Sequence, residues 1–252
     1  MRILLINPNT SQAVTDLVAG HVRSQIGDRA ALRAVTGRFG ARYIASRAAA
    51  AIAAHAALDA LAEHGDGCDA VYLACFGDPG LFALRELSPV PVIGMAEAAC
   101  HEAAATGRFG IVTGGAAWGP MLMEFIGTIG LADRPAAITT IAPSGGEIAA
   151  DPDRALGALA QACRDSHAAG AETVILGGAG LAGLAPRIAA QVRCPLICSV
   201  EAGTRAVLAA TGAPPMPPPR PVPIESTGLA PELARRLAAP EGAPLHRTDP
   251  MP

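Results

Sequence analysis

The chain has 252 residues, 51% of them hydrophobic, which is enough for one large α/β domain or two small ones with a full core. Its net charge of −3 argues against a basic surface that binds nucleic acid or anionic membranes. No apolar run reaches membrane length without polar breaks, and the run at residues 3–6 is too short for a signal peptide. The six cysteines fit neither a CxxC metal site nor a disulfide scaffold, so we expect a cytoplasmic protein with reduced thiols and no metal.

Short apolar strands alternate with helices along the chain, a pattern that favours mainly parallel sheets. We expect strands at residues 2–6, 31–35, 69–74, 91–94, 108–113, 137–142, 172–177 and 195–198. We expect helices up to about residue 26, from Tyr43 to about 63, after Asp78-Pro79, at 96–105, near Trp118, and at 155–167, 200–210 and 229–237. Residues 214–223 indicate a proline-rich linker, and residues 239–252 a disordered tail.

One strand–loop–helix–strand unit occurs twice, about a hundred residues apart. Residues 69–77 align without a gap to residues 172–180, and His64 and His167 each lie five residues before their strand. A proline-led strand that ends in Glu-Ala follows each copy, at 91–98 and at 195–202. Gene duplication is the simplest interpretation, and it predicts two similar lobes with a cleft between them. The copies differ at their tips, where one carries Cys75 and the other Gly178.

Cys75 follows a buried strand and precedes the glycine-rich segment Gly77-Asp78-Pro79-Gly80. Asp78 and Pro79 are typical of an N-cap and first turn, so we expect them to begin the next helix. A thiol between the end of a strand and a helix N-terminus is stabilised as thiolate by the helix dipole. The alternative is an inert buried cysteine, which is common for this residue type.

Polar and glycine residues also follow other strands, where open α/β sheets place ligands. Asn9 and Thr10 can contact a ligand, or they can simply make the turn, with Thr10 or Ser11 as the helix cap. Gly114 and its neighbour Gly115 allow a ligand to approach backbone N–H groups at a helix N-terminus, although such a pair is also an ordinary turn.

Tyr43 is one of two tyrosines in the chain, and it can bind a ligand or pack at the start of a helix. If two lobes face each other across a pseudo-twofold axis, Cys75 and Gly178 flank one ligand from opposite sides.

Four motifs in this order resemble the Asp/Glu/hydantoin racemase superfamily, and most closely its hydantoin and allantoin racemase branch. The resemblance covers about residues 1–238. The motifs are residues 7–11 (Asn-Pro-Asn-Thr-Ser), Cys75 after its strand, residues 108–114 (Arg-Phe-Gly-Ile-Val-Thr-Gly) and residues 176–183 (Leu-Gly-Gly-Ala-Gly-Leu-Ala-Gly).

The resemblance implies an α/β fold of two pseudo-symmetric Rossmann-like lobes, acting without a cofactor. The first lobe comprises residues 1–97 with about 207–238, and the second residues 98–206. It also implies a pair of cysteines that flank the stereocentre of the substrate. Cys75 occupies the first position, but the second, usually in Gly-Cys-Ala-Gly, is Gly178 here. Cys198 stands where the family often has aspartate, and it is a candidate replacement for the missing thiol.

The resemblance further implies a small-molecule substrate, such as hydantoin, allantoin or a related amino-acid derivative, and a homo-oligomer. Three functions stay open with one thiol: a racemase with water or another group on the Gly178 face, a one-thiol decarboxylase of the arylmalonate type, or a ligand-binding homologue without activity. In the first two, Cys75 is the acid/base and backbone N–H groups stabilise the carbanion or enolate. The expected substrate-binding residues are Asn9, Thr10, Tyr43, Phe76, Gly77, Thr113, Gly114, Gly178, Ala179 and Gly180.

Overall fold

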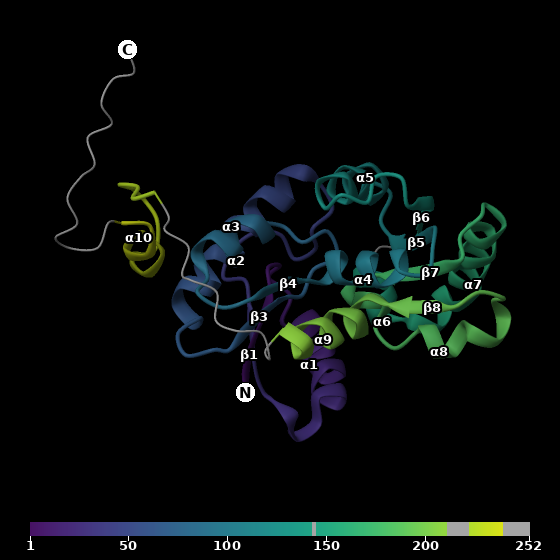
Figure 1. The fold of residues 1–252 in the computed structure, drawn as a ribbon, viewed down its shortest axis with the longest axis horizontal. Helices are drawn as coiled ribbons and strands as arrows, with labels where there is room; N and C mark the ends of the chain where they lie inside the picture. The colour runs from purple at the N-terminus through teal and green to yellow at the C-terminus, as the bar shows by residue number, and fades with distance from the viewer. Residues whose placement is uncertain (143–144, 211–221, 239–252) are drawn as a thin grey trace, which may run out of the picture.

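The computed structural model describes residues 1–142, 145–210 and 222–238, and it contains two four-stranded sheets surrounded by helices (Figure 1). Every strand pairing in both sheets is parallel, as the alternation of strands and helices predicted. The predicted fold class, α/β with mainly parallel sheets, is confirmed. No helix within these residues is both long enough and apolar enough to span a membrane.

The two sheets have the same strand order, which gives the sequence repeat a structural counterpart. The first sheet runs β2-β1-β3-β4 and the second runs β6-β5-β7-β8. The strands are β1 (Arg2–Asn7), β2 (Ala31–Thr36), β3 (Ala70–Leu73), β4 (Val92–Gly94), β5 (Phe109–Gly114), β6 (Pro135–Ile141), β7 (Thr173–Gly177) and β8 (Leu196–Cys198).

At least one helix lies between each pair of consecutive strands along the chain. They are α1 (Gln12–Ile26), α2 (Arg47–His64), α3 (Leu81–Leu87), α4 (Met95–Ala104), α5 (Trp118–Thr128), α6 (Gly145–Ala150), α7 (Pro152–Ala168), α8 (Ala185–Ile188), α9 (Ser199–Ala210) and α10 (Pro231–Leu237). The prediction that Tyr43 begins α2 is wrong: Ser46 is the N-cap and its hydroxyl accepts a hydrogen bond from the Ala49 N–H at 3.1 Å. Residues 214–221 of the predicted linker and the predicted tail at 239–252 lie outside the described residues.

The first sheet is buried on both faces because its central strands are apolar at successive positions. Ile3 and Leu5 of β1 belong to the larger core, shared with α1, α4, α9 and the second sheet. Leu4 and Ile6 belong to a second core, formed with α2 and α3. Alternate side chains of a strand point to opposite faces, so a continuous apolar run is what a doubly covered parallel strand requires.

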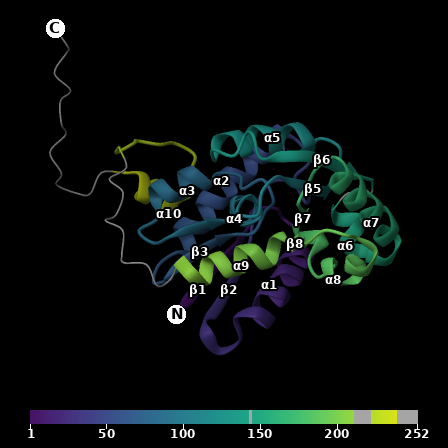
Figure 2. The ribbon, with the colours of Figure 1, turned by 45° about the vertical axis from the view of Figure 1, so that its right-hand side comes forward.

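Helix α9 joins the two halves of the molecule. It follows the last strand of the second sheet, yet it packs against α1 and α4, beside the first sheet (Figure 2). The hydroxyl of Tyr72 in β3 donates a hydrogen bond to the Val200 carbonyl at 3.1 Å. A Cβ atom at Gly203 would lie 2.3 Å from that hydroxyl, so the contact requires glycine. The sheets are therefore held close together, with the carboxyl ends of β1, β3, β5 and β7 around a common space.

Candidate functional site

A cavity lies where the turns after these four strands meet. We call residues 75–80 the Cys75 turn and residues 178–183 the Gly178 turn. Eight of the residues expected from the sequence line the cavity, but Thr10, Gly77 and Gly114 are not among its lining residues. The lining is Asn9, Val14, Tyr43, Ile44, Ala74, Cys75, Phe76, Thr113, Trp118, Gly177, Gly178, Ala179, Gly180 and Leu181.

Cys75 sits at the wall of this cavity, with 9% of its surface exposed. Burial raises the pKa of its thiol far above the usual value, and the negative charge of Asp78 raises it further. The prediction that this position favours the thiolate is therefore wrong. A helix dipole acts within about one turn of the helix end, and desolvation of a buried sulfur outweighs it here.

Asp78 does not cap the helix that follows it, contrary to the prediction from Asp78-Pro79. Helix α3 begins later, with Gly80 as its N-cap. The Asp78 carboxylate instead accepts hydrogen bonds from the backbone N–H groups of Ala96 at 3.0 Å and Glu97 at 2.8 Å. Asp78 thus caps α4, a helix that follows it by 17 residues in the chain, and the first N–H groups of α4 bind the carboxylate and not the thiol.

Asn9 is held in place by its own turn. Its side-chain oxygen accepts hydrogen bonds from Asn7 Nδ2 at 2.9 Å and from the Ser11 N–H at 2.8 Å. Both bonds use Oδ1, so Nδ2 is the donor that Asn9 can offer to a ligand in the cavity. The two interpretations of Asn9, turn former and cavity residue, both apply. Ser11 occupies the N-cap position of α1 but makes no side-chain capping bond.

The opposite wall is built from Thr113 and the Gly178 turn. The Thr113 hydroxyl donates to the Gly177 carbonyl at 2.7 Å, and the Gly178 N–H donates to Ser199 Oγ at 3.0 Å. Gly178 has φ +124°, a conformation that other residues rarely adopt. A Cβ there would meet Thr113 Oγ1 and Leu181 Cδ1 at 3.8 Å, which is ordinary contact, so space for a side chain exists.

Aromatic rings from each sheet's turns lie against bare glycines of the other. A Cβ at Gly177 would lie 2.3 Å from the Phe76 ring, and a Cβ at Gly77 would lie 2.3 Å from the Trp118 ring. The Tyr43 hydroxyl donates to the Gly114 carbonyl at 3.1 Å. These contacts fix the distance between the turns and enclose the cavity with apolar surface.

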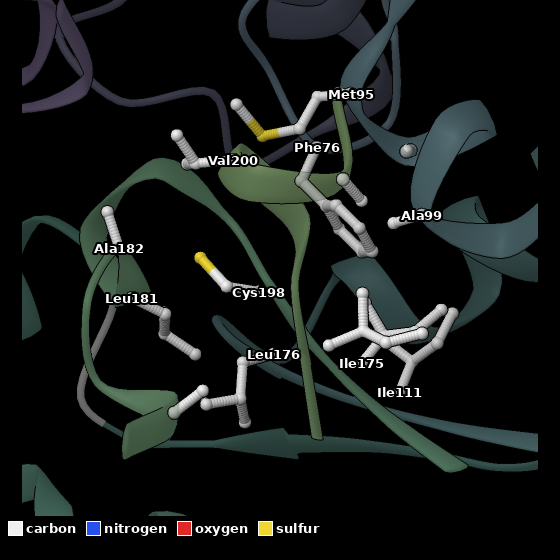
Figure 3. Packing of buried hydrophobic residues seen from close by; sticks show 14 of the residues in the cluster. Phe76, Met95, Ala99, Ile111, Ile175, Leu176, Leu181, Ala182, Cys198 and Val200 are labelled. Carbon is white, nitrogen blue, oxygen red and sulfur yellow. The ribbon is translucent and has the colours of Figure 1, made fainter. Parts of the chain in front are cut away.

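Cys198 does not take the place of a second cavity thiol. It lies on β8, next to β7 as expected, but it is not a lining residue. Figure 3 shows its side chain among Leu176, Leu181 and Ala182, whereas Phe76 lies on the other side near Ala99 and Ile175. Burial raises the pKa of the Cys198 thiol.

The lining contains no charged side chain among the described residues, and these residues include no group of three His, Cys, Asp or Glu placed to hold a metal ion. Polar groups are few: Cys75, Asn9, Thr113, Tyr43 and backbone amides of the Gly178 turn. A free carboxylate or ammonium group would lack a counter-charge, while a neutral amide can exchange hydrogen bonds with these groups.

Sequence reasoning missed the apolar part of the lining, chiefly Val14, Ile44, Trp118 and Leu181. Apolar side chains carry no signal that separates a cavity wall from a core. Trp118 is the exception, since it is the chain's one tryptophan and lies four residues after Gly114, at the start of α5.

Comparison with known proteins gives consistent matches over most of the chain. A family model described as Asp/Glu/Hydantoin racemase matches residues 3–207. A hydantoin racemase of Paenarthrobacter aurescens is 35% identical over 211 residues, which are 81% of this chain and 89% of the relative. The structure of an allantoin racemase from Klebsiella pneumoniae has a TM-score of 0.83 at 31% identity, covering 90% of this chain and 96% of that one. The structure of arylmalonate decarboxylase shares the fold, with a TM-score of 0.60 at 17% identity over 86% of this chain and 96% of that one.

Proposed function

Because the chain belongs to the Asp/Glu/hydantoin racemase family, we propose that it transfers a proton at the acidic carbon of a hydantoin, with Cys75 as the acid/base. The observation that carries this proposal is the position of Cys75 and Gly178, which line one cavity from the ends of equivalent strands. A substrate carbon between them has a thiol on one face and an open, glycine-lined wall on the other.

The polarity of the cavity supports a neutral cyclic amide as substrate. The ring of a 5-substituted hydantoin has carbonyl and N–H groups that can pair with Asn9 Nδ2, the Thr113 hydroxyl and backbone amides. An apolar substituent fits the wall formed by Val14, Ile44 and Trp118. Hydantoins with apolar substituents should therefore bind better than allantoin, whose substituent is polar.

The enolate formed by loss of the proton is stabilised by hydrogen-bond donors and needs no cofactor in this proposal. Cys75 serves one face only. Proton abstraction requires its thiolate, and because burial raises the pKa of this thiol, the rate of abstraction increases with pH across the neutral range. A water molecule at Gly178 completes the transfer on the second face.

The protonation state of Cys75 favours a second candidate, a decarboxylase of the arylmalonate type. A thiol that stays protonated is ready to donate its proton to an enolate made by loss of carbon dioxide. The absence of a charged lining side chain among the described residues would help expel the carboxylate from an apolar site, by destabilising the charged group.

Solvent-deuterium exchange, followed by NMR and chiral chromatography, distinguishes these functions. Each enantiomer of 5-benzylhydantoin, then of allantoin, is incubated with the protein in D₂O. We expect exchange at the acidic carbon, faster for one enantiomer, with slow inversion. Rapid inversion of both enantiomers would indicate a second acid on the Gly178 face of the substrate. Carbon dioxide release from an aryl malonate without hydantoin exchange supports the decarboxylase. If neither hydantoin exchange nor carbon dioxide release is detected, both proposed functions are wrong.

A further inference from the structure

Asp78 is a buried carboxylic acid three residues after Cys75, and its backbone is unusual. Only 3% of its surface is exposed. Within the described ranges it is the one residue other than glycine with a positive φ, at 45°. A left-handed conformation is unfavourable for a residue with a Cβ, so the surrounding contacts must hold it.

The contacts fit a carboxylate closely. Besides the bonds from Ala96 and Glu97, the Asp78 N–H donates to the Cys75 carbonyl at 3.0 Å. A Cβ at Gly94 would lie 2.2 Å from Asp78 Oδ2, so even a methyl group there would displace the acid. The Cys75 turn is therefore fastened to α4 through one side chain.

Backbone N–H groups of α4 stabilise the Asp78 charge, whereas the neighbouring side chains do not. Tyr72 on β3, Cys75 on the turn, and Cys100 and Glu97 on α4 face it, and all are neutral or acidic. The guanidinium of Arg85 on α3 binds the Glu97 carboxylate in a bidentate pair. The N–H groups of α4 are thus the direct partners of the Asp78 charge.

We propose that Asp78 is a positioning residue, which fixes the Cys75 turn on the N-terminus of α4 and controls how readily the Cys75 thiol ionises. The catalytic consequence rests on the proposed role of Cys75, but the electrostatic link between the two side chains does not. In the absence of Asp78, the thiol loses a neighbouring negative charge that opposes its ionisation.

The pKa shifts of the two side chains agree with this link. Burial raises the pKa of Asp78 to about 7, although the bonds from Glu97 and Ala96 oppose the rise. The Asp78 charge in turn raises the pKa of Cys75. Asp78 therefore changes its charge near neutral pH, and the thiolate becomes harder to form as it does so.

The test measures the rate at which iodoacetamide alkylates Cys75 in the full-length protein, resolved by peptide mass spectrometry between pH 5.5 and 9.5. This rate follows the thiolate fraction. For the wild type we expect the logarithm of the rate to rise with pH, flatten near pH 7 as Asp78 ionises, and rise again. For Asp78→Asn we expect a straight rise, and about tenfold faster alkylation above pH 8, which corresponds to roughly one pKa unit.

The matched control is Asp69→Asn, since Asp69 is an exposed acid before the same strand, bonded to the Arg2 N–H at 2.7 Å. Its profile should superimpose on that of the wild type. A wild-type profile that is straight through pH 7 overturns the proposal, even if Asp78→Asn fails to fold. So does an Asp78→Asn profile that keeps the flattening. If the wild-type profile flattens near pH 7 but the protein shows no hydantoin exchange, the role of Asp78 stands and the proposed function is wrong.

Discussion

The Cys75 turn and the Gly178 turn occupy equivalent places in the two sheets, but their side chains are complementary in size and polarity. The first turn carries the large ring of Phe76 and the acidic side chain of Asp78, whereas the second begins with the small residues 178–180 (Gly-Ala-Gly). In order along the chain, the equivalent pairs are Ala74 and Gly177, Cys75 and Gly178, Phe76 and Ala179, Gly77 and Gly180, and Asp78 and Leu181.

The complementarity has a packing reason. The Phe76 ring occupies the space that a side chain at position 177 would fill. A side chain at position 177 and the Phe76 ring cannot occupy the same space. The two equivalent segments therefore differ in a coupled way: Phe76 of the first lies against Gly177 of the second, and the neighbouring Gly178 has a positive φ. Five predictions test this comparison.

The largest expected effect comes from removing the sulfur of the first turn. Cys75→Ser should reduce hydantoin exchange by about 10³-fold or more, because a hydroxyl is a far weaker acid/base at neutral pH. Its fold should persist, since one atom changes. Cys68→Ser is the control: its sulfur bonds the Gly65 carbonyl at 3.0 Å, outside the cavity, and a hydroxyl can make the same bond. Equal activity of the two variants would rule out Cys75 as the acid/base.

The second largest effect concerns the stability contributed by Asp78, a buried acid whose equivalent in the Gly178 turn is the apolar Leu181. An acid whose pKa is raised on folding binds more protons in the folded state, so its contribution to stability is lost as pH rises. The window runs from its usual pKa of about 4 to the folded value of about 7. Urea denaturation at successive pH values should show a fall of up to about 4 kcal/mol for the wild type across this window. The free energy of unfolding of Asp78→Asn should not fall in this way. If it falls equally in both proteins, groups other than Asp78 cause the pH dependence.

Adding a side chain at position 177, against the Phe76 ring, should have the third largest effect. Gly177→Ala places a methyl group 2.3 Å from the ring, and overpacking of this kind costs about 2–3 kcal/mol. The displaced ring should also lower kcat/KM. Gly157→Ala in α7 is the opposite case, since nothing lies within 4 Å of its Cβ, and it should stabilise the protein by about 1 kcal/mol. Thermal unfolding of both variants measures the difference.

Adding a thiol to the Gly178 turn should have a smaller effect. Gly178→Cys has room beside Thr113 Oγ1, but the backbone at φ +124° must change at a cost of about 1–2 kcal/mol. We expect inversion of hydantoin enantiomers to increase about tenfold, limited by this strain. Gly178→Ala has the same strain without the sulfur and should show no increase. If Gly178→Cys leaves inversion flat, the second face of the substrate does not lie against Gly178.

The parallel sheets, the duplication and the meeting of Cys75 with Gly178 could all be predicted, because apolar periodicity and repeated spacing are local properties of the sequence. The role of Asp78 could not, because Asp-Pro is a normal helix start and the competing partner, α4, is fixed by tertiary packing. The protonation of Cys75 also depends on burial, which sequence spacing does not report. The same limit applies to Ile44 and Val14, whose apolar character fits a core as well as a cavity.

The smallest expected effect is a difference between the two tyrosines that connect the halves of the molecule. Tyr43 and Tyr72 each donate a hydrogen bond from the first sheet's side to a backbone carbonyl of the other side, at 3.1 Å in both cases. Tyr43→Phe and Tyr72→Phe should each lower the free energy of unfolding by about 1 kcal/mol. Only Tyr43 lines the cavity, so only Tyr43→Phe should raise KM, by a few-fold, while kcat changes little. Equal KM values for the two variants would mean that the Tyr43 hydroxyl holds the halves together without shaping the substrate site.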